Sequence, residues 1–188
     1  MKREYKKHIK RAMDLFIRSN YADNFLPGQL PAHVTYYQAK LAAGRERYSA
    51  VSDLTQVPWQ IIGVLHGLEA RFDFDRQFIT GEKWKDKTKL EPTGLGPWDT
   101  WDGAAVYGIM KKERPKDWRL INTCLFFEKW NGLGYYKKGL YTPYCWNYLV
   151  PYAVQGGGKY TSDGKYDPKF ISKQVGAVTL LLHCGFFW

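Results

Sequence analysis

Apolar positions along this chain recur at the three- and four-residue spacing of an α-helix, with polar residues between them. The pattern predicts helices over residues 4–18, 33–47, 58–72, 98–110, 117–130 and 168–183. In the first helix the expected buried residues are Tyr5, Ile9, Met13, Phe16 and Ile17. Glycine and proline interrupt the pattern in residues 73–97 and 131–167, so we expect loops without regular structure there.

The best-defined helix begins at Pro58, since the missing N–H of proline costs nothing at a first helical position. Ser52 and Thr55 are candidate N-caps just before it. Its apolar face consists of Ile61, Leu65, Leu68 and Phe72. Glu69 falls at the edge of this face in the last turns, three residues after His66, so the two side chains are neighbours on the helix surface.

Glu69 is therefore a candidate general acid. Apolar surroundings and the negative end of the helix dipole both favour its protonated form. A protonated carboxyl is what a glycosidase uses to donate a proton to the leaving oxygen, with a second carboxylate facing it across a cleft. Glu82, Asp73 and Asp75 follow the helix and are the candidates for that second group. Asp73 and Asp75 also fit a simpler role, in which they cap or solvate the end of the helix.

The size and composition suit one folded domain without a membrane span. The chain has 188 residues, 45% of them hydrophobic, and no run of 18 apolar residues. Its basic N-terminus is not followed by the apolar run of a secretory signal, so we expect synthesis in the cytoplasm. Three widely spaced cysteines and four histidines show no metal-ligand spacing, so we expect no metal and no cofactor.

The net charge of +10 is unevenly distributed. Residues 51–100 hold six basic and eight acidic residues, whereas the rest of the chain is strongly basic. A basic protein attracts a large anionic substrate, and the carboxylates of its acidic region would then cleave that substrate. The charge alone does not distinguish among bacterial wall, acidic polysaccharide and nucleic acid as the partner.

Several motifs occur in an order that resembles one family. The segment HGLEARFDFDRQFITGE matches the pattern H-x-L-E-x-x-x-x-F-x-x-x-x-x-x-G-D through His66, Leu68, Glu69, Phe74, Gly81 and Glu82. It is followed by Trp130-Asn131-Gly132, Pro143-Tyr144 with Trp146, Lys159-Tyr160 with Asp163-Gly164, and Lys173-Gln174. This series resembles phage and bacterial peptidoglycan hydrolases of the lysozyme superfamily. The likeness covers about residues 46–182.

The resemblance implies a mainly α, lysozyme-like α+β fold in which a loop or small hairpin region forms a glycan cleft. Residues 1–188 would form a single catalytic domain, with residues 1–45 as an N-terminal helical extension and residues 46–182 as the core. Glu69 would be the general acid. Glu82 falls where goose-type lysozymes place an acid that positions water, although the pattern prefers Asp there. Asn131, Tyr135, Tyr144 and Trp146 would line the sugar groove. His66, one turn before Glu69, is a further candidate substrate contact by its position, and the alternative is a half-buried histidine whose hydrogen bonds are satisfied within the protein.

The function implied is that of a muramidase, which cleaves the glycan backbone of peptidoglycan between N-acetylmuramic acid and N-acetylglucosamine. A lytic transglycosylase acting on the same bond and a non-catalytic basic module for cell wall or nucleic acid are the alternatives. A wall peptidase or amidase lacks its metal or Cys-His signature here. We expect a monomeric endolysin that binds peptidoglycan, inserts into no membrane and has no nucleic-acid partner. It would reach the wall, in the periplasm or outside the cell, after release.

Overall fold

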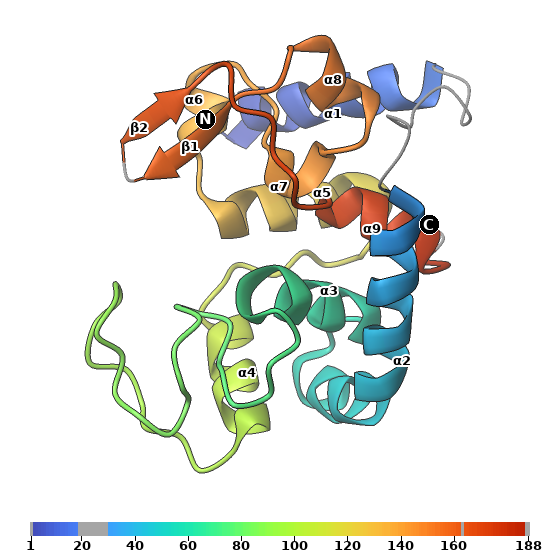
Figure 1. The fold of residues 1–188 in the computed structure, drawn as a ribbon. Coiled ribbons are helices and arrows are strands. Elements are labelled where there is room, and N and C mark those ends of the chain that lie inside the picture. The colour runs from blue at the N-terminus through green and yellow to red at the C-terminus, as the bar shows by residue number, and fades with distance from the viewer. Residues whose placement is uncertain (1, 19–29, 163, 187–188) are drawn as a thin grey trace. The chain divides into compact units, whose positions relative to one another are not determined.

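The computed structural model describes residues 2–18, 30–162 and 164–186. Over these residues it is mainly helical, with 55% helix, nine helices and a two-stranded sheet, which confirms the expected class (Figure 1). The helices are α1 (Lys2–Arg18), α2 (Leu30–Thr55), α3 (Trp59–Ala70), α4 (Trp101–Met110), α5 (Leu120–Asn131), α6 (Gly134–Lys137), α7 (Pro143–Trp146), α8 (Val150–Val154) and α9 (Ala177–His183). The strands are β1 (Lys159–Ser162) and β2 (Lys165–Asp167).

The chain divides into two compact units. Unit 1 combines Met1–Val34 with Pro115–Trp188, and unit 2 is Thr35–Arg114. Helix α1 packs on α5 and α8 within unit 1, so this part of the expected N-terminal extension contributes to the core of that unit. Residues 19–29 of the expected extension lie outside the described residues.

The buried face of α1 differs from the predicted face at Met13, which is only half-buried, at Ile17, and at Ala12, which was not predicted to be buried. Its buried residues are Tyr5, Ile9, Ala12 and Phe16. Ile17 is 65% exposed, so its predicted burial is wrong. Adjacent residues of a helix point about 100° apart, and Phe16 takes the inward position.

A buried asparagine joins α7 to the segment before α9 in unit 1. The Asn147 amide nitrogen donates to the carbonyl oxygens of Ser172 (2.8 Å) and Gln174 (2.6 Å), and the Asn147 carbonyl accepts from the Thr179 hydroxyl (2.7 Å). Gly176 lies so close to the Cys145 carbonyl that a Cβ there would clash with the backbone. These contacts hold Gln174 beside α7, and they explain why the last helix begins at Ala177 and not at the predicted residue 168.

The glycine- and proline-rich part of unit 1 is more regular than the sequence predicts. Residues 131–167 contain the short helices α6, α7 and α8 and an antiparallel hairpin, in which Tyr160 pairs with Tyr166. The hairpin lies beside α6 (Figure 1), with the Tyr160 ring 5.0 Å from the Tyr135 ring. The prediction of structureless loops is therefore wrong here, because contacts with the tyrosine of α6 support a hairpin too short to be stable alone.

Helix α2 continues beyond residue 47, where the sequence predicts its end, and the chain leaves the helical conformation only at residues 56–58. Helix α2 extends to Thr55, whose hydroxyl donates to the Val51 carbonyl (2.8 Å) one turn earlier. Ser52 and Thr55 are thus residues of α2, and the N-cap of α3 is Pro58, with no side-chain cap. The prediction that Ser52 or Thr55 caps α3 is wrong.

Helix α3 is packed closely against α2. A Cβ on Gly63 would collide with the Leu41 side chain, and a Cβ on Gly67 would lie 2.7 Å from the Tyr37 ring. The four residues of the predicted apolar face are all buried, as expected. The helix ends at Ala70, two residues before the predicted end, and its C-cap Arg71 is in the left-handed conformation with φ of 53°. Residues 73–97 contain no helix, as predicted, and α4 begins at Trp101, three residues after the predicted start.

Candidate functional site

Glu69 is the one residue of positions 61–70 in α3 that is not buried. Leu68 and Ala70 on either side of it are buried, as is His66 one turn earlier. The fold therefore holds a half-buried glutamate at the end of a helix that is buried from Ile61 to Leu68. This is the location that the sequence predicts for a proton donor.

The loop that carries Glu82 packs against the end of α3. A Cβ on Gly81 would lie 3.2 Å from the Glu69 carbonyl oxygen, and Gly81 itself has φ of +76°. Glycine adopts this conformation without strain and allows the close approach. The backbone of Gln77 and Glu82 closes the turn, since the Gln77 N–H donates to the Glu82 carbonyl (2.9 Å). Glu69 and Glu82 therefore lie on adjacent parts of unit 2.

The Glu82 carboxylate accepts hydrogen bonds at both oxygens. Its donors are the backbone N–H groups of Lys89 (3.0 Å) and Leu90 (3.1 Å) and the Thr80 hydroxyl (2.9 Å). Desolvation is the largest single influence and raises the Glu82 pKa, but the hydrogen bonds from Leu90, Lys89 and Thr80 together lower it below its ordinary value. Glu82 is therefore an anion at neutral pH, and it also ties the 80–82 turn to residues 89–90.

Asp73 and Asp75 are hydrogen-bonded to each other in the turn after α3. The Asp73 carboxylate accepts from the Asp75 N–H (2.9 Å) and pairs with Arg76 (3.1 Å). Both aspartates are exposed. Asp73 thus has the local, turn-stabilising role that the sequence offers as the simpler alternative.

His66 holds this turn from inside. It has no exposed surface, and it bridges the Tyr48 hydroxyl at Nδ1 (2.9 Å) and the Asp73 carbonyl at Nε2 (3.0 Å). Since a carbonyl only accepts, Nε2 carries the proton and Nδ1 accepts from Tyr48. Burial lowers the His66 pKa to about 4, so the ring is neutral. The structure places His66 as a support of the site, with no surface for a ligand to contact.

Unit 1 contains a pocket of about 740 Å³ between α5, α6, α7 and the hairpin. It is lined by Asn131, Gly134, Tyr135, Lys137, Lys138, Thr142, Pro143, Tyr144, Lys159, Tyr160, Thr161, Ser162, Gly164 and Gln174. The volume falls in the range of about 300–1,000 Å³ that is typical of small-ligand sites. Asp163 of the hairpin motif lies outside the described residues.

Three of the four predicted groove residues line this pocket, namely Asn131, Tyr135 and Tyr144. Asn131 is exposed and donates to the Thr142 hydroxyl (2.9 Å). Tyr135 and Tyr144 are mostly buried, so each offers only a small part of its side chain to the pocket. Trp146 is fully buried and does not line the pocket.

The sequence interpretation named no cation in the groove, yet Lys137, Lys138 and Lys159 all line it. None of the described lining residues is acidic. The Lys159-Tyr160 pair was noticed as a motif, but its place opposite α6 depends on a hairpin that was predicted as loop. The predicted acids thus lie in unit 2, and three of the four predicted groove residues lie in a cationic, aromatic pocket of unit 1.

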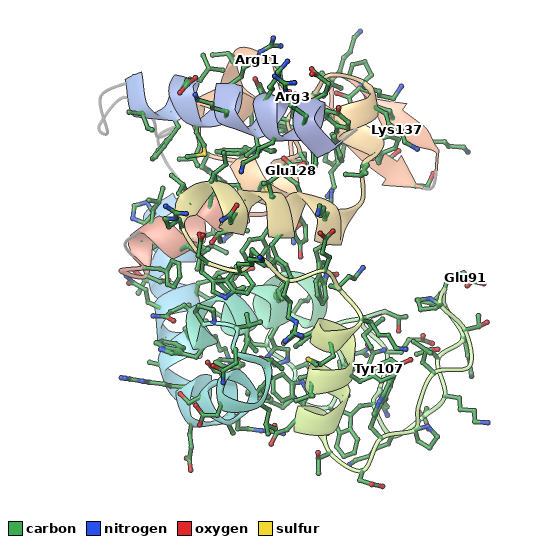
Figure 2. The ribbon with its side chains drawn as sticks, turned by 180° about the vertical axis from the view of Figure 1, so that it is seen from behind. Arg3, Arg11, Glu91, Tyr107, Glu128 and Lys137 are labelled. Carbon is green, nitrogen blue, oxygen red and sulfur yellow. The ribbon has the colours of Figure 1, made fainter. Side chains whose placement is uncertain are left out.

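A buried acid in unit 1, Glu128, was also missed. Figure 2 shows Glu128 between α1 and α5, and its side chain has no exposed surface. Oε1 accepts from the Trp146 indole N–H (2.8 Å). Glu128 follows Cys124 by one turn on the inward face of α5, and this spacing is the one signal that could have indicated its burial.

Burial raises the Glu128 pKa to about 8, although contacts with Trp146, the Thr142 backbone and Tyr5 oppose the rise. Among the described residues, Glu128 Oε2 and the Tyr5 hydroxyl each lack a partner with good hydrogen-bond geometry. The two groups are near enough to interact electrostatically. Burial is the main cause of the raised Tyr5 pKa, and the charge of Glu128 is the second cause. Glu128 is therefore protonated at neutral pH, but it has no access to a substrate.

The described residues form neither a metal site nor a membrane-spanning helix. No group of three or more His, Cys, Asp and Glu side chains among them could hold a metal ion. None of the helices in the described ranges has the length and apolar character needed to cross a bilayer.

Comparison with known proteins identifies no relative. No protein-family model matches the chain, and neither a curated protein nor a solved structure matches it.

Glu128→Gln should remove a pH dependence of stability. The folded pKa of about 8 lies above the ordinary glutamate value of about 4.3, so the folded protein binds the extra proton between these values. Wild-type stability should therefore fall as pH rises from about 4.3 to 8, at up to about 1.4 kcal/mol per pH unit from this group. Gln keeps an acceptor for Trp146 without the charge. Chemical denaturation of both chains at pH 5 and pH 8.5 should show the variant gaining relative stability at the higher pH, and an equal difference at both pH values would contradict the assignment.

Tyr135→Ala should act mainly on stability. Tyr135 is 6% exposed, and its hydroxyl accepts from the Tyr160 N–H (3.0 Å), so deleting the ring leaves a cavity and frees the hairpin. The expected loss is about 3–5 kcal/mol. Tyr135→Phe is the matched control, since it removes only a hydrogen bond worth about 1 kcal/mol. Thermal melts of the three chains test this, and a stable Tyr135→Ala chain that loses oligosaccharide binding would make Tyr135 a ligand contact and not a core residue.

Proposed function

We propose that this protein is a lysozyme-like muramidase that cuts the glycan backbone of bacterial peptidoglycan, with Glu69 as general acid. The observation that carries the proposal is the position of Glu69, the single residue in the last ten of α3 that is not buried. A carboxyl held by a rigid, enclosed helix and open on one side can donate a proton to a bound glycosidic oxygen.

Glu82 supports the proposal as the second carboxylate. Its pKa is lowered, so it is ionised at the pH at which a general acid must be protonated. Two carboxyl groups in different protonation states are the requirement of glycoside hydrolysis. Gly81, directly before Glu82, lies against the backbone of Glu69, and this contact ties the Glu82 loop to the end of α3. The ion pair with Arg76 compensates the charge of Asp73, whereas hydrogen bonds from neutral groups hold the Glu82 carboxylate.

The pocket of unit 1 supports a sugar polymer as the ligand. It combines tyrosine rings with the amide side chains of Asn131 and Gln174. Rings stack on the apolar faces of sugars, and amides and hydroxyls bond their polar edges. The motif order in residues 66–174 adds the resemblance to phage endolysins, which we extend to a role in host lysis.

One observation favours a second candidate, a binding module for anionic polymers. The pocket of unit 1 has lysines and tyrosines but no acid among its described lining residues, so this pocket by itself offers binding and not catalysis. Release of soluble fragments from purified cell walls separates the two functions, since a binding module adsorbs to walls without dissolving them.

Glu69→Gln should abolish wall lysis and leave the fold intact. Gln preserves the shape of the side chain but has no proton to donate, and general acid catalysis contributes about 10²- to 10⁴-fold. Turbidity loss of purified walls gives the rate, and mass spectrometry of the products distinguishes hydrolysis from the anhydro-sugar of a lytic transglycosylase. Glu46→Gln on the exposed face of α2 is the matched control and should keep full activity. A folded Glu69→Gln chain that retains more than a tenth of wild-type lysis would remove Glu69 from the mechanism.

Glu82→Gln should lower the rate by at least tenfold, and by more than Asp73→Asn or Asp75→Asn. Loss of the anion removes the group that activates or positions water. Gln also brings an NH₂ group toward the N–H groups of Lys89 and Leu90, so the 82–98 loop should become more sensitive to protease. Glu91→Gln is the control at the far end of this loop (Figure 2). If Glu82→Gln loosens the loop while lysis persists, or if an aspartate change is the more damaging, Glu82 is a structural residue.

A further inference from the structure

We propose that the pocket of unit 1 selects carboxylate-bearing sugar chains, with Lys137, Lys138 and Lys159 binding the carboxylates. The naming of peptidoglycan as the source of these chains rests on the proposed function. The preference for a charged over a neutral sugar chain rests on the pocket alone.

The three lysines come from two elements that face each other. Lys137 and Lys138 close α6, and Lys159 opens β1. The hairpin is held over α6 by the Tyr160 N–H, which donates to the Tyr135 hydroxyl (3.0 Å), and by the Tyr160 hydroxyl, which contacts the Gly134 carbonyl (3.4 Å). This link fixes the distance between cations that are more than 20 residues apart in sequence.

Two of the ammonium groups are positioned by aromatic rings. Lys138 Nζ lies 5.5 Å from the centre of the Tyr166 ring, and Lys159 Nζ lies 5.7 Å from the centre of the Phe170 ring. Such cation–π contacts restrain a lysine without neutralising its charge. Like charges gathered on one pocket repel each other, and a bound anion relieves that repulsion.

The rest of the lining matches a sugar ring and not a bare anion. Asn131 and Gln174 offer amides, Thr161 and Ser162 offer hydroxyls, and Tyr144 contributes a small part of its side chain. The space of about 740 Å³ admits sugar units together with a substituent. A single-stranded nucleic acid instead needs a basic groove that follows its backbone over several nucleotides, which a pocket confined to α6, α7 and the hairpin does not provide.

Peptidoglycan carries carboxylates at two places, and two different ligands distinguish them in the experiment. A peptide-bearing tetrasaccharide carries them on its peptides, and a tetrasaccharide stripped of peptides carries them on the lactyl groups of muramic acid. Chitotetraose, which has the same N-acetylated sugars without carboxylates, is the neutral reference. A short oligodeoxythymidine is the nucleic-acid arm.

Affinities for these four ligands are measured by calorimetry on the full chain carrying Glu69→Gln, with product analysis to confirm that no cleavage occurs. The test variant combines Lys137→Gln, Lys138→Gln and Lys159→Gln, and a triple Lys→Arg chain preserves the charge. Lys165→Gln is the matched control, an exposed lysine of the same hairpin that does not line the pocket. Circular dichroism verifies that each chain is folded.

We expect the triple Gln variant to lose roughly tenfold to a hundredfold in affinity for at least one carboxylated tetrasaccharide, and less than twofold for chitotetraose. The Arg variant should bind like the parent chain, Lys165→Gln should change affinity less than twofold, and added salt should weaken binding of the charged ligands only. The ligand that responds identifies the peptide or the lactyl group as the source.

Unchanged affinity for both carboxylated ligands in the triple Gln variant would overturn the inference. So would an equal loss for chitotetraose, or oligodeoxythymidine binding tighter than either wall ligand. These outcomes are independent of catalysis. Loss of lysis in Glu69→Gln together with lysine-independent binding refutes the inference alone, whereas lysine-dependent binding together with lysis by Glu69→Gln refutes only the catalytic proposal.

Discussion

A polar group buried in a protein must find its hydrogen-bond partners inside, and this constraint organises both units of the chain. In unit 2 the buried group is His66, whose two ring nitrogens are bonded to Tyr48 of α2 and to the carbonyl of Asp73. In unit 1 it is Asn147, which joins α7 to the segment that leads into α9. Each side chain therefore fixes an irregular segment to a helix, and these segments border the candidate sites: the Asp73 turn follows the helix of Glu69, and Gln174 lines the pocket of unit 1.

The His66 network explains how unit 2 presents an acid. Helix α3 is enclosed by close contacts at Gly63 and Gly67, and its left-handed end at Arg71 directs the chain into the 72–84 turn. With His66 neutral and bonded on both sides, the turn is held without a charge in the core. Glu69 is then the one residue of positions 61–70 in α3 that reaches the surface, and Glu82 is ionised on the neighbouring loop.

The titratable groups of unit 1 differ from those of unit 2 in their burial and charge. Its carboxyl at position 128 is enclosed between α1 and α5 and is protonated at neutral pH, so it adds no negative charge to the core. The lysines of α6 and β1 line the nearby pocket without a described acid in its wall. Three lysines are thereby gathered at a concave surface suited to an anionic ligand.

The local pattern of the sequence predicted the helical class, the apolar face of α3, the loop after α3 and the location of Glu69. These features are predictable because helical periodicity and breaks at glycine or proline depend on residues that are near neighbours in sequence. The site in unit 2 was predictable to that extent, but the support that His66 provides was not, since its partner Tyr48 lies 18 residues away on another helix. The hairpin, the burial of Trp146 and Glu128, and the meeting of Lys137 with Lys159 were decided only by tertiary structure. Each of these depends on contacts between residues distant in sequence, and local spacing carries no information about which distant surfaces will exclude water together.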